Sequence, residues 1–298
     1  MRRSQLALAT VCTGWGTIPL IVRHVDLPAV AIVAVRVWVA AAGLGLVVAL
    51  RRGRGPALLS VERWRIAAVG VVLAAHWVAL FSAYKRVPAG TVVLIVYLAP
   101  VGIAALAPRV LGERVGPRIL AGLGLAVAGV VLVAWPAVHR HGRWTLGVGL
   151  AVVAAVLFVA LVLLSAPVAE AYGGLRCAFL ELAGAGILLV PLAARVGWGH
   201  PQASWAWLVV LGLAHTAIGT GVYLASLPRI GATQTGILGY LEPASVVACS
   251  WAFLGERPGV DTLAGGVLIV VAGALVITSP VAGRVSRPAL EVPAGAVG

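Results

Sequence analysis

The feature that most constrains this chain is a pattern that occurs twice, in the same order and at one constant spacing. The first copy reads Tyr97-Leu98-Ala99-Pro100 and then Leu111-Gly112-Glu113-Arg114. The second copy reads Tyr240-Leu241-Glu242-Pro243 and then Leu254-Gly255-Glu256-Arg257. The copies lie about 143 residues apart, which is close to half of the 298-residue chain. A repeat that joins a proline-bearing apolar run to a charged loop predicts two copies of one folding unit.

Composition indicates that this repeated unit lies in a membrane. Hydrophobic residues make up 61% of the chain and charged residues 10%, whereas about a quarter of the residues of a soluble domain are charged. A soluble core cannot bury so much apolar surface, so lipid is the expected solvent. The net charge of +13 could suggest a nucleic-acid partner, but the arginines stand between apolar runs, where they set membrane orientation. We therefore expect no nucleic-acid partner.

Ten apolar runs are long enough to cross a bilayer as helices, which takes about 20 residues each. Met1-Arg2-Arg3 before the first run could also begin a signal peptide, but the run continues and favours a first spanning helix. The expected fold is an all-α integral membrane protein with short linkers between antiparallel neighbours. The expected spans are Gln5–Val22, Pro28–Leu50, Ile66–Tyr84, Ala89–Ala107, Ile119–Trp135, Leu146–Leu164, Leu175–Ala194, Ala206–Leu224, Ala232–Leu254 and Thr262–Thr278.

Five spans in each half predict two inverted repeats, at residues 5–136 and 144–280, followed by a disordered cytoplasmic tail at 281–298. Because five is odd, the second copy inserts upside down relative to the first, a recurrent design of transporters. Positive residues are about twice as frequent on the side of the N-terminus, which predicts that both termini are cytoplasmic. The Glu113-Arg114 loop then faces the cytoplasm, and the Glu256-Arg257 loop faces outward. The expected location is the cytoplasmic (inner) membrane of the cell.

These motifs resemble the ten-helix, EamA-like members of the drug/metabolite transporter superfamily. The residues that carry the resemblance include Trp15-Gly16, Arg36, Ala89 to Pro100 and Tyr223 to Ala232, together with both Gly-Glu-Arg loops. The resemblance covers nearly the whole chain. It implies secondary transport of small metabolites, often export, without ATP. It also implies a central cavity lined by helices one to four and six to nine, with helices five and ten at the periphery.

Ionisable groups at membrane depth cost at least about 2.5–3.5 kcal/mol each on insertion scales, so they are functional candidates by default. Glu242 is the strongest, because it lies near the centre of the ninth run, directly before Pro243. That proline removes a backbone donor, so we expect free carbonyls near Leu238 and Gly239 beside a carboxylate that binds a proton or a cation. The alternative is a protonated or hydrogen-bonded structural carboxyl. The full set is Arg36, His76, Glu181, His215 and Glu242.

The other ionisable candidates each keep a structural alternative. Arg36 could hold the carboxylate of a substrate, reach the headgroups, or pair with Glu181. His76 and His215 stand in corresponding runs and could relay protons, or donate to backbone carbonyls as neutral imidazoles. Glu181 could be functional or could serve as the partner of another charge.

Aromatic and proline residues complete the predicted site. Tyr97 and Tyr240 precede the matched prolines by three residues, so each lies on nearly the same helix face as its proline. They could contact a solute, or they could be packing residues. Pro100 and Pro243 are expected hinges. Trp15, between two glycines, predicts a close approach of helices around an aromatic wall. The Gly-Glu-Arg loops are expected to cap helix ends.

Motifs for other chemistry are missing from the sequence. There is no Gly-rich loop that ends in Gly-Lys-Ser/Thr, no Gly-x-Ser-x-Gly and no His-Glu-x-x-His. Cys12, Cys177 and Cys249 stand in apolar runs without the spacing of a metal site or a disulfide. We expect no catalytic residue, no metal and no cofactor.

The sequence therefore predicts a secondary active transporter that works by alternating access, and an exporter of amino acids or related solutes. One acid and one base fit a zwitterion, which would bind at Trp15, Arg36, Tyr97, Tyr240 and Glu242. Protons would couple at Glu242, His76 and His215. Partners are the solute, membrane lipid and protons, in a monomer or homodimer. The alternatives are efflux of lipophilic cations, with Glu242 as the counter-charge, and a membrane enzyme or scaffold, for which the acids are few and scattered.

Overall fold

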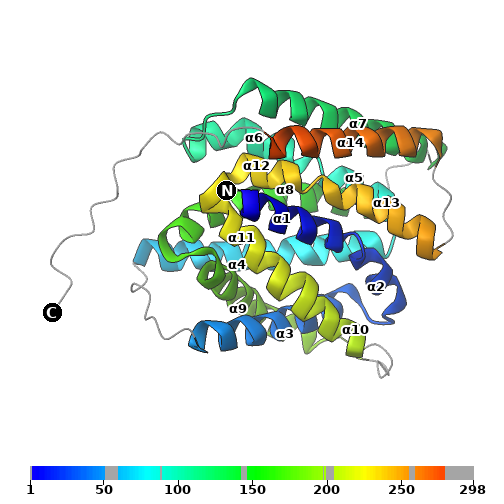
Figure 1. Cartoon of the computed structure of the whole chain (residues 1–298). Helices are drawn as coiled ribbons and strands as arrows, with labels where there is room; N and C mark the ends of the chain where they lie inside the picture. Colours follow the sequence, from blue (N-terminus) through cyan, green and yellow to red (C-terminus); the bar gives the residue numbers. More distant parts are fainter. Residues whose placement is uncertain are drawn as a thin grey trace.

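The computed structural model describes residues 2–50, 60–87, 89–141, 146–196, 198, 205–254 and 259–278. Over these ranges the chain is helical and contains no β-strand, and its helices run roughly along one common axis (Figure 1). The helices of the first half are α1 (Arg2–Trp15), α2 (Ile18–His24), α3 (Ala29–Leu50), α4 (Ser60–Tyr84), α5 (Ala89–Val96), α6 (Ala99–Val110) and α7 (Pro117–His141). Those of the second half are α8 (Leu146–Tyr172), α9 (Gly174–Ala193), α10 (Trp205–Val210), the π-helix η2 (Leu211–Ile218), α11 (Gly219–Ile230), α12 (Ala232–Leu238), α13 (Leu241–Leu254) and α14 (Val260–Ile277).

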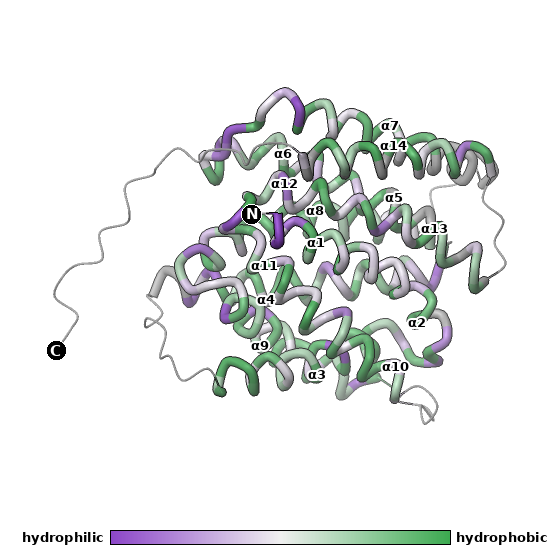
Figure 2. Tube along the Cα trace, viewed as in Figure 1, coloured by the Kyte–Doolittle hydropathy of each residue, from purple (hydrophilic) through white to green (hydrophobic). Residues whose placement is uncertain are grey.

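The described helices have the dimensions and the surface of a membrane protein. Large apolar side chains are turned outward along many helices, for example Val156 at 64% exposure and Phe253 at 74%. Figure 2 shows that hydrophobic residues predominate along most of the helices. Contiguous apolar surface on this scale is foreign to a soluble monomer, and it matches a lipid-facing exterior. Six segments are long and apolar enough to cross a bilayer: Arg2–Val22, Ala29–Leu50, Arg63–Tyr84, Leu146–Tyr172, Gly174–Ala193 and Trp205–Ile230.

Several predicted spans are interrupted helices rather than continuous ones. The first breaks at Gly16 and Thr17, the fourth at Tyr97 and Leu98, and the ninth between Leu238 and Leu241. A proline follows each break near the start of the next helical piece, namely Pro19, Pro100 and Pro243. Proline supplies no backbone N–H and clashes with the preceding turn, so the helix ends just upstream of it. The continuous spans expected from hydropathy are corrected accordingly.

The interrupted helices lie inside the bundle, and two long helices cover one side of it. Helices α7 and α14 lie side by side along that side (Figure 1) and form the most extensive helix pair of the fold. Towards the interior, α12 packs on α6, and α13 packs on α5. The rings of Tyr97 and Tyr240 are 5.6 Å apart between centroids. The two proline-associated breaks therefore meet in the middle of the bundle.

The first Gly-Glu-Arg loop caps a helix, as predicted, but the helix belongs to the other half of the chain. Glu113 is 4% exposed. One of its carboxylate oxygens accepts a hydrogen bond from the Ala232 N–H at 2.5 Å, and the other accepts from the N–H and hydroxyl of Thr233 at 3.1 and 2.8 Å. Gly231 precedes α12 at φ +82°, where an added Cβ would lie 3.1 Å from Glu113. The second loop, residues 255–258, lies outside the described residues, as does the predicted tail at 281–298.

Candidate functional site

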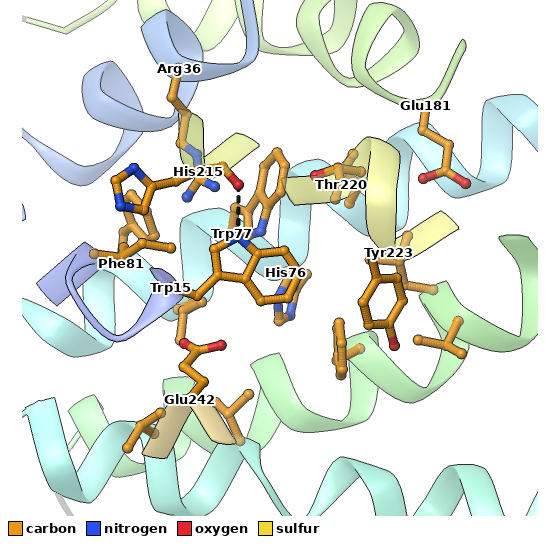
Figure 3. Close-up of a pocket in the computed structure, with 18 of the residues that line it drawn as sticks. Trp15, Arg36, His76, Trp77, Phe81, Glu181, His215, Thr220, Tyr223 and Glu242 are labelled. Atoms are coloured by element: carbon orange, nitrogen blue, oxygen red, sulfur yellow. Dashed lines mark hydrogen bonds between the residues drawn. The ribbon is translucent and has the colours of Figure 1, made fainter. Parts of the chain in front are cut away.

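A cavity of ≈ 100 Å³ opens between the two halves of the bundle. An engineered cavity of about 150 Å³ can hold benzene, so this space suits a small solute. The lining side chains come from α1, α2, α3, α4, α5, α8, α9, η2, α11 and α13, and among the described residues none comes from α7 or α14. Helices α7 and α14 overlap the fifth and tenth spans predicted from the sequence. The family resemblance implies that these two spans lie at the periphery of the bundle. All five predicted ionisable residues line the cavity, as Figure 3 shows: Arg36, His76, Glu181, His215 and Glu242.

Arg36 is buried beneath two aromatic rings. Its side chain is 3% exposed, and its guanidinium carbon lies 4.2 Å from the ring centre of Trp77 and 4.9 Å from that of Phe81. Such cation–π contacts offset part of the cost of burying the charge. Nε donates to the Thr216 hydroxyl at 2.9 Å, and within the described chain the terminal N–H groups have no hydrogen-bond partner. The structure shows neither the predicted pairing with Glu181 nor a path to the headgroups.

Thr216, which accepts the hydrogen bond from Arg36, lies in a π-helix that the sequence did not predict. The Thr216 hydroxyl donates to the Leu211 carbonyl, five residues earlier, at 2.7 Å. His215 lies in the same turn, and its backbone carbonyl accepts a hydrogen bond from Trp15 Nε1 at 2.7 Å. The Nε2 atom of the His215 ring lies 2.7 Å from the Thr17 hydroxyl. π-Helical turns inside α-helices are frequent at functional sites. Here the widened turn connects the second half of the chain to α1 and α3.

Trp15 forms one wall of the cavity, and glycines make room for it. An added Cβ at Gly219 would lie 2.5 Å from Trp15 Nε1, and one at Gly16 would clash with Ser245. The Ser245 hydroxyl donates to the Thr13 carbonyl at 2.5 Å. The close approach predicted around Trp15 is therefore present at Gly16, where α1 meets α13.

Glu242 lies in the first turn of α13 and faces the cavity. The Tyr97 hydroxyl donates to its Oε2 at 2.5 Å, a length typical of a hydrogen bond to a carboxylate. Arg36, which carries the opposite charge, lines the same cavity. The Gly239 carbonyl, which we expected to be free, accepts from the Glu242 N–H at 2.9 Å. That expectation is corrected, because the chain tightens into a three-residue turn before Pro243.

Tyr240 does not reach the cavity. It is fully buried at 0% exposure and packs behind Tyr97, and it is absent from the residues that line the cavity. Its hydroxyl has no hydrogen-bond partner within the described chain. In this conformation Tyr240 is a packing residue, and its contact with a solute remains a prediction. Pro100 and Pro243 stand where two helices are interrupted, and movement about them remains a prediction.

His76 has the geometry of a neutral imidazole that donates to a backbone carbonyl, which was the structural alternative to a proton relay. Its Nδ1 donates to the Ala154 carbonyl of α8 at 2.8 Å, and its ring stacks on Phe158 with centroids 5.3 Å apart. The backbone carbonyl fixes the position of the imidazole, although one side of the ring still borders the cavity. Glu181 also lines the cavity, and its Oε1 accepts from the Cys177 thiol at 3.1 Å.

The sequence model of the EamA-like transporter family matches this chain twice, over residues 2–135 and 145–279. The chain belongs to this family. A probable terminal-alkyne amino-acid exporter of Streptantibioticus cattleyicolor is 30% identical over 261 residues, and the match covers 78% of this chain and 87% of that protein. The pseudopaline exporter CntI of Pseudomonas aeruginosa is 28% identical, with 83% and 85% covered. A solved crystal structure at 22% identity has a TM-score of 0.73 and covers 92% of this chain and 97% of that one, so the two share a fold.

In this EamA-like transporter, several cavity residues were not predicted from the sequence. Trp77 directly follows His76 and could have been found from that neighbour. Small hydroxyl residues and additional aromatics inside apolar helices carry no such signal, because they are common packing residues in membranes. The described residues contain no group of three or more His, Cys, Asp or Glu side chains that could hold a metal ion. The unpredicted lining residues that matter below are Phe81, Ser165 and Tyr223.

Proposed function

We propose that this EamA-like transporter exports small zwitterionic metabolites, amino acids or close relatives of them, by proton-coupled alternating access. The observation that carries the proposal is the pairing of Arg36, with unpartnered N–H groups, and the Glu242–Tyr97 pair in one buried cavity. A guanidinium suits a carboxylate, and a carboxyl suits an ammonium group or a proton. The name of one relative, an amino-acid exporter, supports the same class of solute, and the name of the second supports export of a small metabolite.

The proposed topology is ten spans in two inverted five-helix repeats, at residues 5–136 and 144–280. The protein lies in the inner (cytoplasmic) membrane, with both termini in the cytoplasm. The match of the family to each half and the paired helix breaks support two equivalent units. Cysteines placed at Arg114 and Arg257 test the inversion, because a membrane-impermeant maleimide should label them from opposite sides. Labelling from one common side would contradict the inverted arrangement.

The solute is proposed to bind between Arg36 and the aromatic walls. Its carboxylate accepts from the terminal N–H groups of Arg36, while Trp15 and Tyr97 pack against its body. The hydrogen bond from Trp15 to the His215 carbonyl and that from Tyr97 to Glu242 hold both rings in place. The rigid walls therefore lower the ordering cost of binding.

A proton on Glu242 is proposed to drive export. When Glu242 is ionised, the Tyr97 hydroxyl and the charge of Arg36 stabilise it. The ammonium group of the solute and a proton would compete for the ionised carboxyl of Glu242, so each would lower the affinity of the other, as proton-coupled export requires. This reciprocity is the thermodynamic requirement for coupling two ligands at one site. His215, hydrogen bonded to Thr17, is the proposed relay, and His76 keeps a lesser part in it because its Nδ1 is bound to a carbonyl.

Alternating access requires contacts that close one end of the cavity and can open. Two such contacts occur at the end of the bundle that holds the start of α1: the Glu113 cap of α12, and a hydrogen bond from Gln5 to Gln234 at 3.3 Å. Both bring an element of the first half against α12. The breaks next to Pro100 and Pro243 are the proposed hinges, because interrupted helices can bend without loss of further hydrogen bonds.

The decisive experiment is transport in proteoliposomes with and without an imposed pH gradient. Amino acids whose levels differ between cells with and without the protein are chosen as solutes and are supplied in radiolabelled form. We expect Glu242→Gln to abolish stimulation by the gradient, while Glu170→Gln, an exposed carboxyl at the end of α8, leaves it intact. Full stimulation in Glu242→Gln would contradict proton coupling at this residue.

Efflux of lipophilic cations is the second candidate, and one observation favours it. Two carboxyls line the cavity against one guanidinium, and Trp15, Trp77, Phe81, Phe158 and Tyr223 supply aromatic walls. Aromatic faces attract cations. Protection of growth against cationic dyes, without any change in amino-acid efflux, would favour this function over the first.

A further inference from the structure

A second polar group lies in the cavity apart from Arg36 and Glu242. Glu181 on α9 is 2% exposed and is held by the Cys177 thiol, one turn earlier, at 3.1 Å. The same thiol lies 3.8 Å from the carbonyl oxygen of Ser165 on α8, so Ser165 is a neighbour of this group. Its hydroxyl is fully buried and has no hydrogen-bond partner within the described chain. Both residues line the cavity, and a buried hydroxyl without a partner is unusual enough to indicate a missing ligand.

Of the two carboxyl groups in the cavity, Glu181 is the one whose charge is less well compensated. Glu242 has a hydrogen bond from Tyr97 and the electrostatic support of Arg36. The hydrogen bond that the described residues supply to Glu181 comes from the neutral thiol of Cys177. A buried carboxylate without a cation is strongly unfavourable. Glu181 therefore needs a proton or a positively charged or hydrogen-donating group from the solute.

The packing of α3 against α9 sets the separation between Glu181 and Arg36. Trp38 Nε1 donates to the Gly186 carbonyl at 3.0 Å, and an added Cβ at Gly45 would meet the ring of Phe179. The two helices are thus antiparallel, and Glu181 lies level with a residue about two turns beyond Arg36. At 1.5 Å per residue the two side chains start about 10 Å apart along the helix axes. Figure 3 shows them at separate corners of the cavity.

Arg36 and Glu181 therefore occupy separate corners of the cavity (Figure 3). The ammonium and carboxylate of an α-amino acid are attached to the same carbon, whereas a solute with a distal amine can place one charged group at each corner. We propose that Glu181 and Ser165 form a second subsite, which binds an ammonium or other donor group at the far end of an extended solute held by its carboxylate at Arg36. The inference rests on the proposed export of amino acids and narrows the substrate class to those with a distal amine.

Matched pairs of amino acids test the subsite directly. Binding of 2,3-diaminopropionate, ornithine and lysine to the purified full-length protein is compared with that of alanine, norvaline and norleucine, which lack the distal amine. We expect preference for the amine to rise with chain length and to be greatest for lysine over norleucine. Glu181→Gln should weaken lysine binding by about 10- to 100-fold, the range of a charge-assisted hydrogen bond, and leave norleucine within about twofold. Ser165→Ala should weaken lysine binding by a smaller factor.

The controls separate this proposal from the proposed function. Glu170→Gln serves as the matched carboxyl variant outside the cavity, and thermal unfolding in detergent verifies that each variant is folded. If Glu181→Gln does not fold, the chain-length series on the unaltered protein and the Ser165→Ala variant still decide. Equal binding of lysine and norleucine, or equal weakening of both by Glu181→Gln, would overturn the subsite and leave amino-acid export standing. Binding of none of the six compounds would overturn both.

Discussion

Replacement of Glu113 by alanine tests whether the contact between the two halves closes the cavity. The carboxylate accepts three hydrogen bonds, from two backbone N–H groups and one hydroxyl at the start of α12. Loss of a helix cap costs about 0.5–2 kcal/mol, and each buried donor left without a partner costs about 1–3 kcal/mol. We therefore expect Glu113→Ala to destabilise the closed arrangement by about 2–4 kcal/mol, since local relaxation recovers part of the sum.

A free-energy change of this size has a visible effect on access to the cavity. At about 1.4 kcal/mol per factor of ten, 2 kcal/mol raises the open population about 30-fold. Gln5, which is buried against Gln234, is the reporter. The native cysteines are first removed, and Gln5→Cys is added to this background. While Glu113 is kept, the new cysteine should react slowly with a maleimide. The same cysteine should react at least about tenfold faster when Glu113 is alanine.

Two variants calibrate this measurement. Thr233→Val removes one hydroxyl but keeps both backbone hydrogen bonds, so it should cost about 1 kcal/mol and accelerate labelling less. Glu170→Ala, on the exposed end of α8, lies outside this contact and should leave labelling unchanged. If Glu113→Ala matched Glu170→Ala in labelling, the idea that this loop holds the two halves together would be refuted.

Three further predictions concern the cavity. Arg36→Lys keeps the charge but loses the planar stack on Trp77, so we expect the KM for amino-acid transport to rise about tenfold; an unchanged KM would exclude Arg36 as the carboxylate site. Glu242→Gln should make the rate of export independent of an imposed pH gradient, measured in proteoliposomes, and a retained response would move coupling elsewhere. Gly219→Ala places a Cβ 2.5 Å from Trp15 Nε1, so we expect about 1–3 kcal/mol of destabilisation by overpacking; an unchanged unfolding temperature would show that Trp15 can move freely.

Much of the architecture followed from local properties of the sequence. The length and apolarity of each run predicted helices in a membrane, because every backbone polar group in lipid must be paired within its own segment. The positions of Pro19, Pro100 and Pro243 determine where helices are interrupted, because the missing donor acts on the preceding turn whatever lies around it. The cost of burying charge likewise led to the five ionisable residues, and the structure brings all of them to one cavity.

The partners of those residues could not be predicted in the same way. Which side chain meets which carbonyl depends on the rotation and the register of two packed helices, and no single helix fixes either. Sequence reasoning therefore offered Glu181 as a partner for Arg36, where the structure has Thr216, Trp77 and Phe81.

By itself, the sequence determined that this is a helical membrane protein built from a doubled unit, and which costly polar groups it contains. Only the tertiary structure decided that Tyr240 packs behind Tyr97, that a π-helical turn presents Thr216, and that Glu113 caps a helix of the opposite half. The reason is the range of the interactions. Hydropathy, proline geometry and the cost of burial act within a few residues. Hydrogen-bond partners across a bundle are separated by 78 positions for His76 and Ala154 and by 232 for Thr13 and Ser245, and they are selected by packing.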